Sequence, residues 1–251
     1  WQINNYMNTF EQKDENLDFW KEWTDITDIE KQAIESIIEA RKLIVAAVPE
    51  EALVAIYIKG SFTRREMVEG SDVDIVPIVT ENEYQGAIFG VNDNDIHPAT
   101  VIPLSIQELK NNELATKSET DPDTRAKPDR LLKFLDECKI IYGNSLNIKD
   151  YPIRSDKEAL KDEIEVIRNG YIPLYLNNEI PFEALLKEVF WLVELEQTIK
   201  GKDVNHNFAS INGVVTDPDH IIHQAYELRG KPDREKEDDF ITNLEKYLEN
   251  K

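Results

Sequence analysis

Apolar residues recur with two different periods along the first half of the chain. Over residues 28–41 they return every three or four positions, which predicts an amphipathic helix that ends before Pro49. The mostly β-branched run at residues 53–58 has the length of a buried strand, and residues 72–79 alternate as a second strand. A third strand is predicted to end at Ile102. This half therefore predicts an α/β (α+β) core with a mixed sheet.

The second half is predicted to be mainly helical. A polar loop at residues 118–129 leads into a helix at residues 130–137, and a short strand follows at residues 139–143. The remaining helical patterns are separated by glycines and lie at residues 157–168, 182–200, 218–229 and 235–249. We therefore expect a catalytic domain over residues 1–152 and a C-terminal helical bundle over residues 153–251.

The densest candidate chemistry lies between the first two strands. Gly60 and Ser61 end the first strand in a turn, where a glycine lets backbone donors approach a phosphate closely. Asp72 and Asp74 follow at the start of the second strand, and its period of two puts both carboxylates on one face. Two crowded carboxylates need a cation, and Mg²⁺ prefers carboxylate, phosphate and water oxygens.

This arrangement resembles the signature of the polymerase-beta-type nucleotidyltransferase superfamily. The shared features are Gly60-Ser61, a spacer of similar length and the pair Asp72 and Asp74 between hydrophobic residues. The resemblance implies ATP as co-substrate and two Mg²⁺ ions, with Asp72 and Asp74 as metal ligands. It also implies that Gly60, Ser61 and Arg64 bind the phosphates.

The same resemblance implies a third acidic residue on the following strand. By its flanking residues, Thr100 stands where relatives have an aspartate. Asp95, or Asp93 beside it, is the alternative third carboxylate, and Asp95 is our candidate for a third catalytic residue. His97 is a weaker candidate base: histidine is the residue type suited to proton transfer near neutral pH, but a histidine before proline is more often a turn or packing residue.

The region after residue 139 is similar to the antibiotic (aminoglycoside-type) nucleotidyltransferases, in which a strand ending in Tyr-Gly precedes a helical domain. In such relatives the helical domain supplies much of the acceptor site, a lysine for the triphosphate and a glutamate base. Lys187 is the corresponding lysine candidate here, and Glu188 or Glu194 the glutamate. A solvated helix face explains these charges equally well.

Another family difference is Arg65, which occupies a position that is often glycine in the superfamily. The turn is therefore expected to have a different shape.

The best hypothesis is Mg²⁺-dependent transfer of AMP from ATP to a hydroxyl of a small molecule. The alternatives are a catalytically silent nucleotide-binding module, suggested by Thr100, or transfer to a protein or a tRNA end.

Composition restricts the partners. The 251 residues carry a formal net charge of −21, which disfavours nucleic acid as a partner and favours cationic small molecules or a basic protein.

No apolar run reaches the roughly 20 residues that span a bilayer, and the amino end lacks a leader pattern, so we expect a cytoplasmic protein. The single cysteine, Cys138, has no partner for an internal disulfide and is expected to pack as a small hydrophobe. The acceptor, base preference and oligomeric state stay open.

Overall fold

The computed structural model describes residues 17–115, 125–229, 231 and 233–251, so the start of the predicted loop at residues 118–129 lies outside the described residues. The described chain forms two compact units, one up to residue 153 and one from residue 154 onward. Among the described residues, none of the helices is long and apolar enough to cross a membrane.

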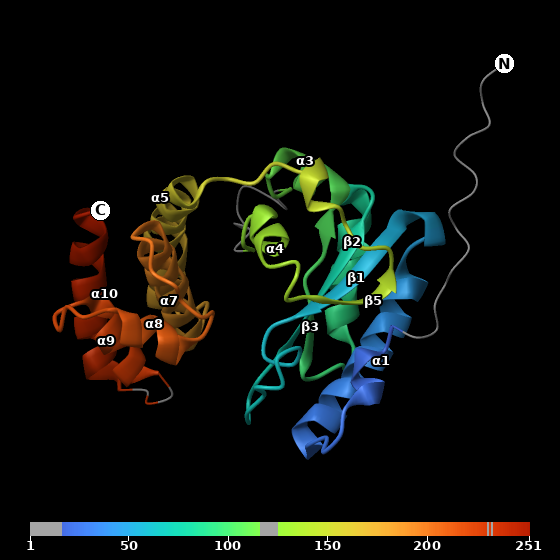
Figure 1. Cartoon of the computed structure of the whole chain (residues 1–251), viewed down its shortest axis with the longest axis horizontal. Helices are drawn as coiled ribbons and strands as arrows, with labels where there is room; N and C mark the ends of the chain where they lie inside the picture. Colours follow the sequence, from blue (N-terminus) through green and yellow to red (C-terminus); the bar gives the residue numbers. More distant parts are fainter. Residues whose placement is uncertain (1–16, 116–124, 230, 232) are drawn as a thin grey trace. The chain divides into compact units, whose positions relative to one another are not determined.

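The first unit is built on a mixed five-stranded sheet (Figure 1). The strands pair in the order β3-β2-β1-β5, and β4 pairs with the far part of β2. The central strand β1 is antiparallel to β2 and β5, whereas β2 is parallel to β3 and β4. The strands are β1 Leu53–Lys59, β2 Val73–Val79, β3 Ala99–Val101, β4 Leu104–Ser105 and β5 Lys139–Gly143.

Helix α1, Asp28–Ala47, covers one face of this sheet. Thr27 caps the helix in a capping box with Glu30, which satisfies backbone donors of the first turn. Its apolar stripe is fully buried and packs with side chains of β1 and β2 in one core cluster. The buried residues of this cluster include Ala33, Ile37, Ala40, Ile44, Ile56, Ile58, Val73 and Ile75.

The opposite face is covered by α3, Ile106–Asn111, and α4, Asp129–Lys133. Tyr57 and Val76 point to this side and pack with leucines of both helices. Helix α4 is shorter than predicted, because from Phe134 onward the backbone N–H groups bond three residues back in tight turns. The remaining short elements of this unit are α2, Gln85–Phe89, and the 3₁₀ turns η1 Phe19–Glu22, η2 Glu50–Ala52, η3 Asn82–Tyr84, η4 Gly90–Asp93 and η5 Ile148–Asp150.

The second unit is a helical bundle around α7, its longest described helix (the unit runs from yellow to red in Figure 1). Its elements are α5 Asp156–Val166, the π-helical turn η6 Ile167–Tyr171, α6 Ile172–Leu176, α7 Phe182–Ile199, α8 Phe208–Val214, α9 Ile221–Leu228 and α10 Arg234–Glu249. Gly170 does not break the chain into separate helices, because the π turn joins α5 to α6 and buries Ile167 and Ile172. Helix α8 is not among the helical patterns predicted from the sequence; Asn207 caps it, because its Oδ1 accepts the Ser210 N–H at 2.8 Å.

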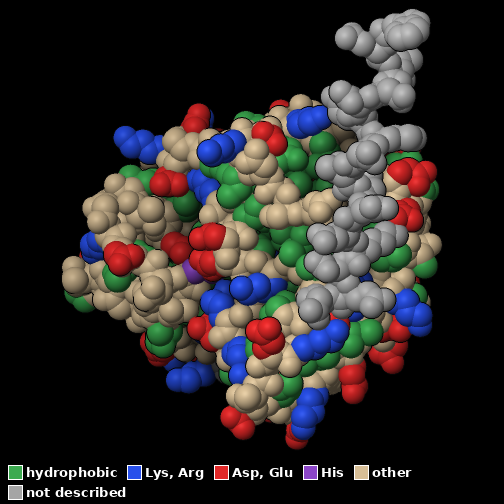
Figure 2. Space-filling model, turned by 45° about the vertical axis from the view of Figure 1, so that its right-hand side comes forward, with side chains coloured by type: hydrophobic (Ala, Val, Ile, Leu, Met, Phe, Trp, Pro, Cys, Tyr) green, Lys and Arg blue, Asp and Glu red, His purple; other side chains and the backbone are tan. Residues whose placement is uncertain are grey.

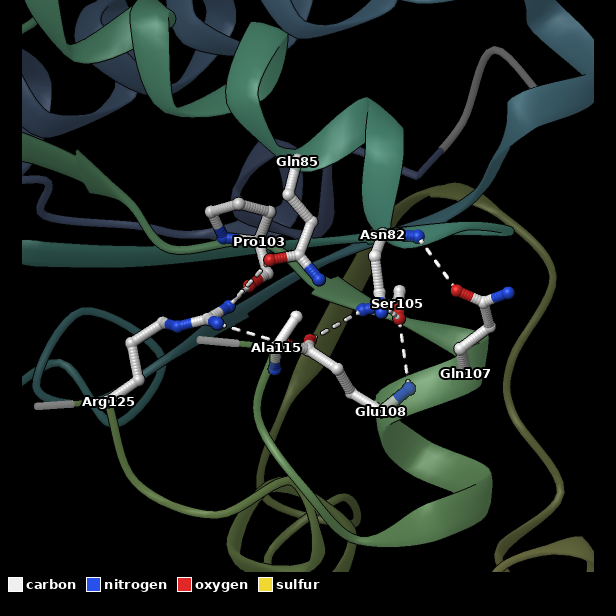
Figure 3. Close-up of polar contacts among 8 residues, drawn as sticks. All are labelled: Asn82, Gln85, Pro103, Ser105, Gln107, Glu108, Ala115 and Arg125. Atoms are coloured by element: carbon white, nitrogen blue, oxygen red, sulfur yellow. Dashed lines mark hydrogen bonds and ion pairs between the residues drawn. The ribbon is translucent and has the colours of Figure 1, made fainter. Parts of the chain in front are cut away.

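A buried polar network ties Arg125 to the sheet unit (Figure 3). Its Nη2 lies 2.8 Å from Glu108 Oε1, and these side chains are only 8% and 1% exposed. Arg125 Nη1 donates to Gln85 Oε1 at 3.0 Å and to the Pro103 carbonyl at 2.6 Å. Glu108 Oε1 also accepts the Ala115 N–H at 2.7 Å. The network therefore joins α2, α3 and the chain on both sides of residues 116–124.

Candidate active site

Asp74 lies on β2 and faces the sheet side opposite α1. Its neighbours Val73 and Ile75 are fully buried in the α1 cluster, so strand alternation directs the Asp74 carboxylate to the other face. Lys59, the last residue of β1, is its direct partner in the antiparallel register. Lys59 Nζ lies 3.0 Å from Asp74 Oδ2. The two side chains are 43% and 25% exposed, so a ligand from solvent can reach this ion pair.

Asp72 lies one residue ahead of β2 and is exposed. The strand alternation predicted for residues 72–79 therefore begins in the loop, and only Asp74 of the two aspartates pairs in the sheet. Within the part of the chain that the structure describes, no group of three or more His, Cys, Asp or Glu side chains could hold a metal ion. Binding of a metal ion by Asp72 and Asp74 stays a prediction.

The turn at Gly60 and Ser61 lies directly beside Asp74. A Cβ atom built on Gly60 would be 3.6 Å from Asp74 Oδ2, and Gly60 takes a φ of +88°, a conformation that glycine adopts without strain. Phe62 is fully buried and anchors the turn in the α1 cluster, while Thr63 Oγ1 donates to the Gly60 carbonyl at 2.9 Å. The core thus fixes the turn next to the carboxylate.

Arg65 holds this loop against the start of α1. Its Nε lies 2.9 Å from Glu30 Oε1, and its guanidinium stacks over the Trp23 ring. Hydrogen bonding from Arg65 is the largest cause that lowers the pKa of Glu30 to about 2. Arg65 has a φ of +58°, in the left-handed region that glycine tolerates best. A glycine would adopt this conformation with less strain, and the Glu30 ion pair holds the loop here.

Arg64, the residue that we predicted to contact the triphosphate, is exposed and pairs within the same loop. Its Nε lies 2.8 Å from Glu66 Oε2, and the Glu66 side chain is 52% exposed. Such an exposed pair is weak and easily exchanged for another anion. Phosphate binding by Arg64 stays a prediction.

The strand next to β2 carries Thr100, the residue that the superfamily resemblance aligned with an acid. In the parallel pairing of β2 and β3, Thr100 stands next to Asp74, and it is exposed. Asp95 is exposed in the turn between η4 and β3, three residues before the buried Pro98. The alignment of Thr100 with the acidic position of the superfamily stays a prediction. A catalytic role for Asp95 stays a prediction, as does one for the exposed His97.

Lys59 is a site residue that sequence reasoning did not single out. The sequence pattern that points to Lys59 was present, because residues 57 and 59 of an alternating strand share a face and the next strand begins with an acid.

Cys138 lies close enough for both Lys59 and Asp74 to act on it electrostatically. Burial is the main cause that raises the pKa of this thiol to about 11, so it stays protonated at neutral pH.

Three further candidates lie on α7 in the second unit. Lys187 and Glu188 are half-buried in the middle of the helix. Glu194 hydrogen-bonds His206 Nδ1 at 2.8 Å, and the imidazole stacks on Trp191 with 4.2 Å between ring centroids. Glu194 therefore already has a partner within its own unit. Binding of the triphosphate by Lys187 and base roles for the glutamates stay predictions.

Comparison with known proteins identifies the architecture. No protein-family model matches the chain, and no curated protein matches it. Among solved structures it is similar to spectinomycin adenyltransferase AAD(9) from Enterococcus faecialis, determined with ATP and spectinomycin, at a TM-score of 0.56. The chain has a nucleotidyltransferase fold. The match covers 86% of this chain and 98% of that one at 15% identity, so the likeness is one of fold.

This result confirms the mixed-sheet core and the helical second half that the sequence predicted. Fold alone does not carry an activity from one protein to another. The chemistry of this nucleotidyltransferase fold must therefore be argued from its own residues.

Proposed function

We propose that this protein is a Mg²⁺-dependent nucleotidyltransferase that moves AMP from ATP to a hydroxyl of a small molecule. The observation that carries the proposal is the contact between the Gly60 turn and Asp74, with 3.6 Å from a Cβ built on Gly60 to the carboxylate. This geometry supports a site in which the turn would bind phosphate and the acid would bind a metal ion at one point on the sheet. The likeness in fold to an adenyltransferase supports the same conclusion.

The donor set suits magnesium. Mg²⁺ is commonly held by one or two carboxylates together with substrate phosphates, and Asp72 and Asp74 supply two accessible carboxylates. Bound there, the ion would stabilise charge on the triphosphate and on the departing pyrophosphate. The two ions implied by the superfamily resemblance would call for a further acid, and Thr100 offers a hydroxyl instead.

The transfer itself follows from positioning. The acceptor oxygen forms a bond to the α-phosphorus of ATP as the bond to the bridging β-oxygen breaks. Pyrophosphate leaves with that electron pair, and the hydroxyl proton passes to water. Gly60 and Ser61 present backbone N–H groups to the phosphates, and the Lys59 ammonium lies beside them to offset negative charge.

A small cationic acceptor agrees best with the surface. The formal charge of −21 favours the approach of cations and disfavours nucleic acid, although acidic and basic side chains are interspersed on the face shown in Figure 2. The matched adenyltransferase was determined with spectinomycin, a small molecule. We place the protein in the cytoplasm, where ATP and Mg²⁺ are available.

The proposal predicts binding and turnover together. Calorimetry with a non-hydrolysable ATP analogue and Mg²⁺ is expected to show one nucleotide per chain. Pyrophosphate release is expected to rise at least tenfold over the acceptor-free rate with one member of a panel of aminoglycosides and spectinomycin. Absence of nucleotide binding would contradict the proposal.

A second candidate is a nucleotide-binding module without efficient transfer, which Thr100 next to Asp74 favours. Nucleotide binding without pyrophosphate release from any acceptor would support this module. Incubation of the protein with α-labelled ATP and a cell extract tests the remaining alternative. Label in protein or tRNA would assign a macromolecular acceptor instead of a small molecule.

A further inference from the structure

We infer that this site binds a single divalent ion and that the Lys59 ammonium supplies the second positive charge for the phosphate chain. The inference rests on the proposed function, because it concerns how the same site handles a triphosphate. It departs from the two-ion arrangement that the sequence resemblance implies. Three observations support it, and each concerns residues of the sheet unit.

The first observation is the place of Lys59. Its Nζ lies 3.0 Å from Asp74 Oδ2, where a metal ion on that carboxylate would compete with it. The residue directly precedes Gly60, so the strand fixes its backbone at the start of the phosphate turn. At 43% exposure its side chain retains freedom to move from the carboxylate to a nearby phosphate oxygen.

The second observation is the missing acid. A second ion in such sites takes ligands from a third carboxylate, but the register places the neutral Thr100 beside Asp74. The third is that no group of three metal-ligating side chains occurs among the described residues. With Asp72 and Asp74 both holding the first ion, a second dication would find no acid left to hold it.

This arrangement has a consequence for metal affinity. Without nucleotide, Lys59 and the ion compete for Asp74, so the free protein is expected to bind Mg²⁺ or Mn²⁺ weakly. When a triphosphate is present, Lys59 moves to the phosphates and leaves Asp74 to the ion. An exposed pair of unit charges at this distance is worth about 1 kcal/mol, which corresponds to roughly a fivefold change in ion affinity.

The test counts bound Mn²⁺ by electron paramagnetic resonance in titrations with and without α,β-methylene-ATP. Wild-type protein is expected to hold one Mn²⁺ per bound nucleotide. The variant Lys59→Met is expected to bind Mn²⁺ about fivefold more tightly without nucleotide, and to bind the nucleotide more weakly. The double variant Lys59→Met/Thr100→Asp is expected to hold two ions. Lys139→Met is the matched control, because Lys139 pairs with Ile58, whose side chain faces α1.

Two Mn²⁺ ions per nucleotide in the wild type, or unchanged Mn²⁺ affinity in Lys59→Met, would overturn the inference and leave Lys59 as an ordinary cross-strand partner. Lys59→Gln provides a second neutral variant if Lys59→Met fails to fold, which circular dichroism would detect. Failure of the wild type to bind the nucleotide at all would instead overturn the proposed function. The two failures are therefore distinguishable.

Discussion

Pyrophosphate release is expected to fall at least about a thousandfold in the double variant Asp72→Asn/Asp74→Asn, while the fold stays intact. A metal ion on a transferring phosphate supplies several kcal/mol of charge stabilisation, and each 1.36 kcal/mol is a factor of ten in rate. Asparagine matches aspartate in size but lacks its charge. Neither aspartate lies in the core, since Asp72 is exposed and the Asp74 side chain is 25% exposed. A coupled assay for pyrophosphate measures the rate.

Glu69→Gln is the matched control for the double variant. Glu69 is an exposed acid in the loop three residues ahead of Asp72, and its change removes one negative charge near the site. Turnover close to that of the wild type is expected. Undiminished pyrophosphate release from Asp72→Asn/Asp74→Asn would refute the role of these aspartates. A loss of equal size in Glu69→Gln would show that net charge, not metal binding, explains the effect.

Replacement of Arg125 by methionine is expected to lower the free energy of unfolding of the sheet unit by about 3 kcal/mol. The change leaves the Glu108 carboxylate, 1% exposed, without its cation, and a buried charge that loses its partner costs about 3–5 kcal/mol. The carbonyl of Pro103 and the amide of Gln85 lose their donor as well. Ser105 and Ala115 N–H groups still bond Glu108, which keeps the expected value at the lower end of the range.

Native-state hydrogen exchange of the β1 and β2 amides measures this loss for the sheet unit alone, because exchange in these central strands reports its full unfolding. The control is Arg64→Met, which removes an arginine from an exposed pair with Glu66. That pair is expected to contribute less than about 1 kcal/mol. Equal effects of the two variants would contradict a structural role for the buried network.

Periodicity alone predicted most of the sheet unit correctly. The α1, β1 and β2 patterns are long and continuous, and burial on one side follows from period 3.6 in the helix and period 2 in the strands. The same reasoning failed where tertiary packing overrides local signals. Gly170 was expected to separate helices, yet the π turn continues the chain because Ile167 and Ile172 both fill the bundle core.

Only part of the candidate site could be predicted, because contacts between distant segments of the chain place some of its residues. Gly60 and the two aspartates lie close in sequence and their spacing indicates their chemistry. Thr100, by contrast, is placed beside Asp74 by strand register, which spacing along one chain does not specify. Arg65 meets Glu30 across 35 residues, so the contact that holds its left-handed backbone was invisible in the local sequence.

The most direct test of the central claim is a crystal of the protein soaked with α,β-methylene-ATP and Mn²⁺, measured at the manganese absorption edge. We predict anomalous density between the carboxylates of Asp72 and Asp74, with the triphosphate against the backbone of Gly60 and Ser61. Manganese away from both aspartates, or a triphosphate bound remote from the Gly60 turn, would contradict the account.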